Sequence, residues 1–136
     1  MGFFEKTIEK TKASTKSLSS KYNESKDTSK IKSQINSEKA KVKECYETIG
    51  KEYYRYTYDG DESHKECFDG LVAQINESRK LIEELEAQLD EVRASGAAER
   101  EEIKANRDAK VAEIEASDAE AKAEKERIRK ENDDTF

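Results

Sequence analysis

Proline and tryptophan are absent from this chain of 136 residues, and histidine occurs only once. Without proline the commonest helix breaker is missing, so the sequence favours long helices. Hydrophobic residues make up 33% and charged residues 43%, whereas ordinary globular domains have about 45–50% and about 25%. Such a composition cannot fill a thick layered core, but it can fill a narrow seam between helices.

Long apolar runs are also missing. No stretch approaches the roughly 18–20 apolar residues of a membrane span, and the start of the chain lacks the apolar core of a secretory signal. We therefore expect a cytoplasmic location, where the two cysteines are expected to be free thiols. The sequence shows no nucleophile–base pairing, no phosphate-binding glycine loop and no paired buried carboxylates, so we expect no enzyme and no cofactor.

Charge is distributed unevenly along the chain. Residues 1–43 carry 11 lysines against five acids, a net of +6, whereas residues 44–96 carry −8 and residues 97–136 carry −4. The basic head can pair with the acidic body of the chain, or it can bind an anionic membrane or nucleic acid. Both alternatives stay open at this point.

Apolar residues recur every seven positions in two stretches that together span residues 31–95. This spacing predicts a coiled-coil seam between two helices, interrupted by the polar Ser78. The predicted seam residues are Ile35, Val42, Ile49, Tyr53, Tyr56, Phe68, Leu71, Ile75, Ile82, Leu85, Leu89 and Val92.

A turn signal separates these two stretches at residues 58–63, where Gly60 stands between two aspartates. Ser63 followed by Glu66 has the pattern of a capping box that opens the second helix. A short loop makes the two helices antiparallel neighbours. Tyr53 then faces Phe68, and apolar residues face each other at every level.

The flanking segments complete the predicted fold, which is all-α. Residues 1–22 predict a basic amphipathic helix, 23–30 a Ser/Thr-rich linker and 96–136 a charged, solvated C-terminal helix that either docks on the hairpin or projects from it. The apolar edge of the long antiparallel hairpin predicts cover by the flanking helices or by a second copy, with a dimer favoured.

The first residues offer a candidate contact with a membrane or a partner, formed by Phe3, Phe4, Ile8, Lys6 and Lys10. They could lie flat on an anionic membrane. Alternatively, the apolar members cover the helical bundle or a second chain. Intervening glutamates dilute the apolar face and favour the second interpretation.

Four tyrosines precede the turn. Tyr53 and Tyr56 belong to the predicted seam, whereas Tyr54 and Tyr58 point elsewhere and are candidates for a contact at the tip. The favoured interpretation is an aromatic plug that closes the hairpin end. The alternative is an exposed tip that recognises a partner. Single-stranded nucleic acid is disfavoured because stacking sites need a basic groove, and the tip is acidic.

Metal binding is not expected at the tip. His64 and Cys67 share a helix face, but a structural zinc site needs four ligands. In the hairpin, Cys45 lies roughly 13 Å along the helix axis from Cys67, which excludes it as a third ligand and argues against a disulfide between the two cysteines.

Three segments carry a family resemblance: "MGFFEK", "KIKSQINSEKAKVKECYETIGKEYY" and "INESRKLIEELEAQLDEV". Residues 1–95 resemble the N-terminal coiled-coil half of small bacterial zinc-ribbon proteins. The resemblance implies a bacterial origin and a helical hairpin. The chain has no CxxC motif, so no zinc-ligand role carries over from that family.

Together these patterns predict a non-catalytic coiled-coil scaffold or interaction protein, with a second copy or another helical protein as its partner. The alternative is a peripheral membrane protein at the inner face of the membrane, anchored by its N-terminal helix.

Overall fold

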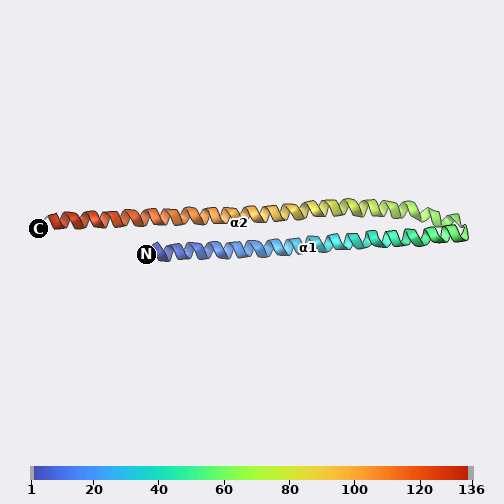
Figure 1. The fold of residues 1–136 in the computed structure, drawn as a ribbon, viewed down its shortest axis with the longest axis horizontal. Coiled ribbons are helices and arrows are strands. Elements are labelled where there is room, and N and C mark those ends of the chain that lie inside the picture. The colour runs from blue at the N-terminus through green and yellow to red at the C-terminus, as the bar shows by residue number, and fades with distance from the viewer. Residues whose placement is uncertain (1, 135–136) are drawn as a thin grey trace. The chain divides into compact units, whose positions relative to one another are not determined.

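The computed structural model describes residues 2–134, which form two long helices joined by a tight turn (Figure 1). Helix α1 spans Gly2–Asp59, the 3₁₀ helix η1 spans Glu62–Lys65, and α2 spans Glu66–Asp134. The described residues contain no strand. The prediction of an all-α helical hairpin is therefore confirmed.

The two helices contribute to two compact units. Unit 1 combines residues 2–23 of α1 with residues 95–134 of α2, and unit 2 comprises residues 24–94, including the turn. Within each unit an α1 segment lies antiparallel to an α2 segment (Figure 1).

Unit 2 has an apolar core. Ile31, Ile35 and Leu85 form a buried cluster, and half-buried Ile82, Leu89 and Val92 pack against it. Eleven of the twelve predicted seam residues are buried or half-buried, and Tyr53 is the exception. The seven-residue pattern thus identifies most of the side chains that hold unit 2 together.

The assignment of Tyr53 to the seam is wrong. The second buried series on α1 is Ile31, Glu38, Cys45 and Glu52, one position before the tyrosines. One residue along a helix turns the side chain by about 100°, so Tyr46 and Tyr53 project away from α2 and are exposed. Hydrophobicity alone selected Tyr53 over the half-buried Glu52.

A polar layer interrupts the apolar seam of unit 2. Ser78 is only 1% exposed, and its Oγ accepts a hydrogen bond of 3.0 Å from Gln74 Nε2. Glu38 also hydrogen-bonds Ser78, and Lys41 Nζ donates to Glu38 Oε1 at 2.9 Å. Every member of this layer has a partner, so it fixes the pairing of the helices without leaving a buried polar atom unsatisfied.

Gly60 reverses the chain. Its φ of 65° lies in the left-handed region, which glycine adopts without a steric penalty, and its N–H donates to Tyr56 O at 2.9 Å, closing the end of α1. The predicted capping box at Ser63 is wrong. Asp61 is the N-cap of η1, and its Oδ1 accepts from Ser63 N at 2.9 Å.

The predicted linker at residues 23–30 is wrong, because this segment lies inside α1. Ser, Thr and Asn each lower helix propensity by less than about 0.7 kcal/mol. No proline stops the helix, and Thr28 Oγ1 donates to Ser25 O at 3.1 Å. Helix α2 likewise continues through Gly96. The predicted flanking helices are therefore extensions of α1 and α2.

Unit 1 buries a different kind of side chain. Its buried and half-buried positions, as far as residues 2–23 and 95–134 show them, are Gly2, Lys6, Glu9, Ala13, Ser17 and Ser20 on α1, and Gly96, Arg100, Ile103, Arg107, Val111 and Ile114 on α2. Positions on each helix recur after 11 residues, as Gly2 and Ala13 do. Small and charged residues dominate this interface.

Helix α2 extends past α1 within unit 1. A side chain at Gly2 would meet the carboxylate of Asp118, so the start of α1 lies beside that residue. Residues 119–134 are all exposed. The prediction of a solvated C-terminal helix therefore describes only residues 119–134. Residues 96–114 of α2 pack on α1 instead.

Candidate functional site

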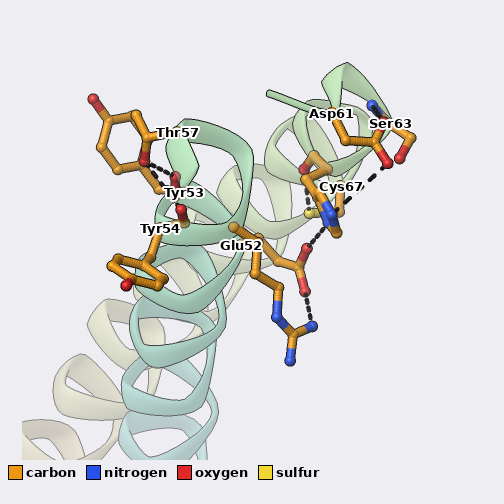
Figure 2. A network of polar contacts seen from close by, with 9 residues as sticks. Glu52, Tyr53, Tyr54, Thr57, Asp61, Ser63 and Cys67 are labelled. Carbon is orange, nitrogen blue, oxygen red and sulfur yellow. Dashed lines mark hydrogen bonds and ion pairs between the residues drawn. The ribbon is translucent and has the colours of Figure 1, made fainter. Parts of the chain in front are cut away.

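A polar network holds the tip of the hairpin together (Figure 2). The carboxylate of Glu52 accepts hydrogen bonds from His64 Nδ1 at 2.6 Å and from Arg55 Nη1 at 3.3 Å. His64 Nε2 lies 4.0 Å from Asp61 Oδ2. The single histidine therefore links α1 to the turn and to η1, which is a structural role.

Cys67 completes this network. Its Sγ donates to His64 O at 3.0 Å, and both Cys67 and the buried Cys45 are free thiols. In the part of the chain that the structure describes, no group of three or more His, Cys, Asp or Glu side chains could hold a metal ion.

The tyrosines of the tip lie on the outside of α1. Figure 2 shows Tyr53 and Tyr54 projecting on the side of the helix away from the Glu52 carboxylate. Tyr54 and Tyr58 stack with ring centroids 5.8 Å apart and planes 11° from parallel. We call Tyr46, Tyr53, Tyr54 and Tyr58 the tyrosine face; all four side chains are exposed.

The interpretation of these tyrosines as a plug is not what the structure shows for most of them. Only Tyr56 turns inward, where it is half-buried like Phe68. Tyr54 and Tyr58, the candidates for a tip contact, are accessible at 66% and 78% exposure.

A second unpartnered surface runs along α1 in unit 1. We call it the N-terminal stripe; it consists of Phe4, Ile8, Thr11, Thr15, Leu18 and Tyr22. These positions alternate steps of four and three, so they share one face of the helix. That face lies opposite Lys6, Ala13 and Ser20, which point toward α2. Phe4 and Leu18 are each 68% exposed, and Phe3 beside them is 85% exposed.

The lysines of this segment divide between the two faces. Lys6 pairs with Glu115 at 3.1 Å and is half-buried, so it lies on the face toward α2 rather than beside the stripe. Lys10, Lys16 and Lys21 are exposed and form no ion pair within residues 2–134, and they lie between the stripe and the face that packs on α2. Lys10 therefore remains a candidate contact.

Sequence reasoning missed the inner face of unit 1. The sequence signal was available, because Gly2, Ala13 and Ser20 are small residues at helical spacing, but the larger residues of the stripe gave the stronger pattern. Apolar size does not decide which face pairs when the opposite face permits closer contact.

No protein-family model matches the chain, and neither a curated protein nor a solved structure shows significant similarity to it. The resemblance to the coiled-coil half of zinc-ribbon proteins stays a prediction. What the fold defines is the class: an all-α helical hairpin. Within residues 2–134, no helix has an apolar stretch long enough to cross a membrane.

Proposed function

We propose that the protein is a non-catalytic coiled-coil scaffold of the bacterial cytoplasm that binds another helical chain, in the first place a second copy of itself. The observation that supports this proposal is the exposed tyrosine face at the tip of unit 2. Tyrosine rings are enriched at protein interfaces because they bury a large area at a low cost in conformational entropy.

The shape of the tyrosine face suits a helix. Gly50 lies between Tyr46 and Tyr53 on this side of α1, and a side chain added there would meet no atom within 4 Å. A neighbouring helix can therefore approach the backbone of α1 closely, with the rings packing on either side of the contact.

The same face can pair with its own copy. A two-fold interface places one patch against itself, so the patch must be self-complementary. Lys43 and Glu47 are exposed beside Tyr46 and provide one charge of each sign for pairing across the two copies. A dimer formed in this way covers the aromatic surface that the single chain leaves open.

Light scattering combined with size exclusion tests this function. We expect the wild type to have the mass of a dimer, and the Tyr46→Ser/Tyr53→Ser variant to have the mass of a monomer with unchanged circular dichroism. Val72→Ser is the matched control, because Val72 is exposed on α2 outside the tyrosine face, and it should remain a dimer.

Two results contradict the proposal. A wild type that stays monomeric at every concentration and captures no helical partner removes the interaction. A double variant that dimerises as tightly as the wild type assigns the interface to another surface.

A further inference from the structure

We infer that the N-terminal stripe docks on an anionic membrane surface, with Phe4, Ile8, Leu18 and Tyr22 entering the interface between headgroups and acyl chains. The inference concerns residues 3–22 of unit 1 and does not depend on the tyrosine face. Three observations support it: the packing of α1 in unit 1, the hydrogen bonds from threonine hydroxyl groups to the helix backbone, and the positions of the lysines.

The packing of this segment is inverted relative to an ordinary soluble helix. The side facing α2 carries glycine, alanine, serine and charged residues, whereas the large apolar side chains face outward. Soluble helices normally bury their apolar stripe. The inner face even leaves Ser20 Oγ buried without a hydrogen-bond partner. Because α2 occupies the polar side, the apolar side is free to meet another surface.

The threonines on and beside the stripe donate their hydroxyl groups to the helix backbone, as Thr48 and Thr57 of unit 2 also do. Thr11 Oγ1 donates to Thr7 O at 2.8 Å, and Thr15 Oγ1 donates to Thr11 O at 3.0 Å. Thr7 makes the same bond to Phe3 O at 2.9 Å. Each hydroxyl donor is already satisfied by the helix backbone, so burying these residues does not leave a donor unpaired.

The charges near the stripe favour an anionic membrane as the surface that covers it. On a helical projection at 100° per residue, Lys16 lies about 120° to one side of the centre of the stripe, and Lys10 and Lys21 lie about 100–120° to the other side, between the stripe and the face that packs on α2. None of the three has an ion-pair partner within residues 2–134. Long lysine side chains at this position can reach lipid phosphates while their stems cover the apolar boundary. The arrangement therefore complements an anionic surface.

A second copy of the chain is the competing occupant. Residues 2–23 carry five lysines and two glutamates; Glu5 lies about 100° from the centre of the stripe, as Lys21 does, and Glu9 lies on the face toward α2. Two stripes packed face to face would bring together flanks in which positive charge dominates, and like charges at such positions destabilise a helix pair. Charge complementarity thus favours the membrane.

Co-sedimentation with vesicles tests the inference. Vesicles of phosphatidylcholine with phosphatidylglycerol should pellet the wild-type protein at low salt, and vesicles of phosphatidylcholine alone should not. Binding should weaken at physiological salt, where the Debye length falls to about 8 Å. The Phe4→Glu/Leu18→Glu variant should lose binding, because it removes the apolar contact.

The lysine variant provides an independent measurement. Each lysine near an anionic surface contributes about fivefold in affinity, so Lys16→Glu/Lys21→Glu should weaken binding at least about 30-fold. Lys122→Glu/Lys125→Glu is the matched control, with the same charge change on the exposed end of α2. Ile128→Glu is the control for the apolar change. Both controls should retain binding.

Several outcomes overturn the inference. One is a wild type that does not bind anionic vesicles at low salt; another is a lysine variant that binds as well as the wild type. If Phe4→Glu/Leu18→Glu halves the molar mass in solution while vesicles are not bound, the occupant is a second copy. A further one is binding to duplex DNA that Lys16→Glu/Lys21→Glu weakens and Phe4→Glu/Leu18→Glu leaves unchanged. That result would assign the lysines to nucleic acid instead.

The test of membrane binding can be distinguished from the test of the proposed scaffold function. Tyr46→Ser/Tyr53→Ser should bind vesicles as the wild type does, and the Phe4→Glu/Leu18→Glu variant should keep the dimer mass. Each surface therefore has a variant that disables it alone.

Discussion

Units 1 and 2 are built from the same two helices, yet they bury different mixtures of side chains. Unit 2 packs isoleucine and leucine at its centre, with one fully partnered polar layer. Unit 1 packs mainly glycine, alanine, serine and charged residues, with half-buried Ile103, Val111 and Ile114 on α2, and it leaves phenylalanine, leucine and tyrosine outside. The comparison teaches that an apolar core holds unit 2 together, whereas the largest apolar side chains of α1 in unit 1 lie outside its interface with α2.

The spacing of the buried positions differs in the same way. In unit 2 they repeat every seven residues, a period of 3.5 per turn, and in unit 1 they repeat every 11, a period of 3.67. A seven-residue repeat favours a left-handed supercoil and an 11-residue repeat a right-handed one. The two periods lie on either side of the 3.6 residues per turn of a straight helix.

Replacing an interface isoleucine by aspartate should give the largest difference in stability between the two units. Ile75 is 6% exposed, and Ile75→Asp places an unpaired carboxylate in the seam of unit 2, at an expected cost of more than about 4 kcal/mol. We expect loss of helical circular dichroism or of assembly.

The counterpart in unit 1 is Ile103→Asp. Ile103 is half-buried, and Lys16 and Arg107 line the same groove, so the new carboxylate has cations near it. We expect the free energy of unfolding to fall by about 1–2 kcal/mol. Denaturant unfolding measures this loss, and hydrogen exchange shows which residues lose protection. Equal effects of the two variants would contradict the difference between the units.

Removing a buried hydroxyl should change stability in opposite directions. Ser78→Ala in unit 2 breaks the hydrogen bonds with Gln74 and Glu38 and should cost about 1 kcal/mol. Ser20→Ala in unit 1 removes an oxygen that has no partner and should stabilise by up to about 1 kcal/mol. Thermal melts of the two variants measure the sign, and a destabilised Ser20→Ala would show that its hydroxyl is satisfied.

The smallest expected effect is the response of unit 2 to acid. The backbone N–H and the hydroxyl of Ser63 hold the pKa of Asp61 below its ordinary value of 3.8, with His64 adding to the shift. The hydrogen bond from Lys41, followed by that from Ser78, lowers the pKa of Glu38 from 4.5. A carboxyl with a lowered pKa stabilises the fold above its unfolded pKa and loses that contribution as the pH falls through the folded pKa.

Protection of residues 24–94 from hydrogen exchange should therefore decline as the pH falls below about 4.5. The Asp61→Asn variant should show a smaller decline than the wild type, because one of the two titrating groups is gone. Asp27→Asn, an exposed change on the same unit, is the control and should follow the wild type.

Much of unit 2 was predictable from local pattern. The seven-residue repeat identified Ile35, Ile75 and Leu85 as buried residues, and Gly60 identified the reversal. The predictions failed where a side chain competes with its neighbour for the interface, as Tyr53 does with Glu52. The ion pair from Glu52 to His64 joins residues on both sides of the turn, and no local pattern reveals it.

The sequence by itself determined that the chain is helical, reverses near residue 60 and buries a narrow seam, because proline is absent, glycine tolerates a positive φ, and apolar residues recur at a helical period. Only the tertiary structure decided which face of α1 pairs with α2 in unit 1. Close approach of small residues and ion pairs such as Lys6 with Glu115 depend on the partner helix, and hydrophobic periodicity carries no information about that partner.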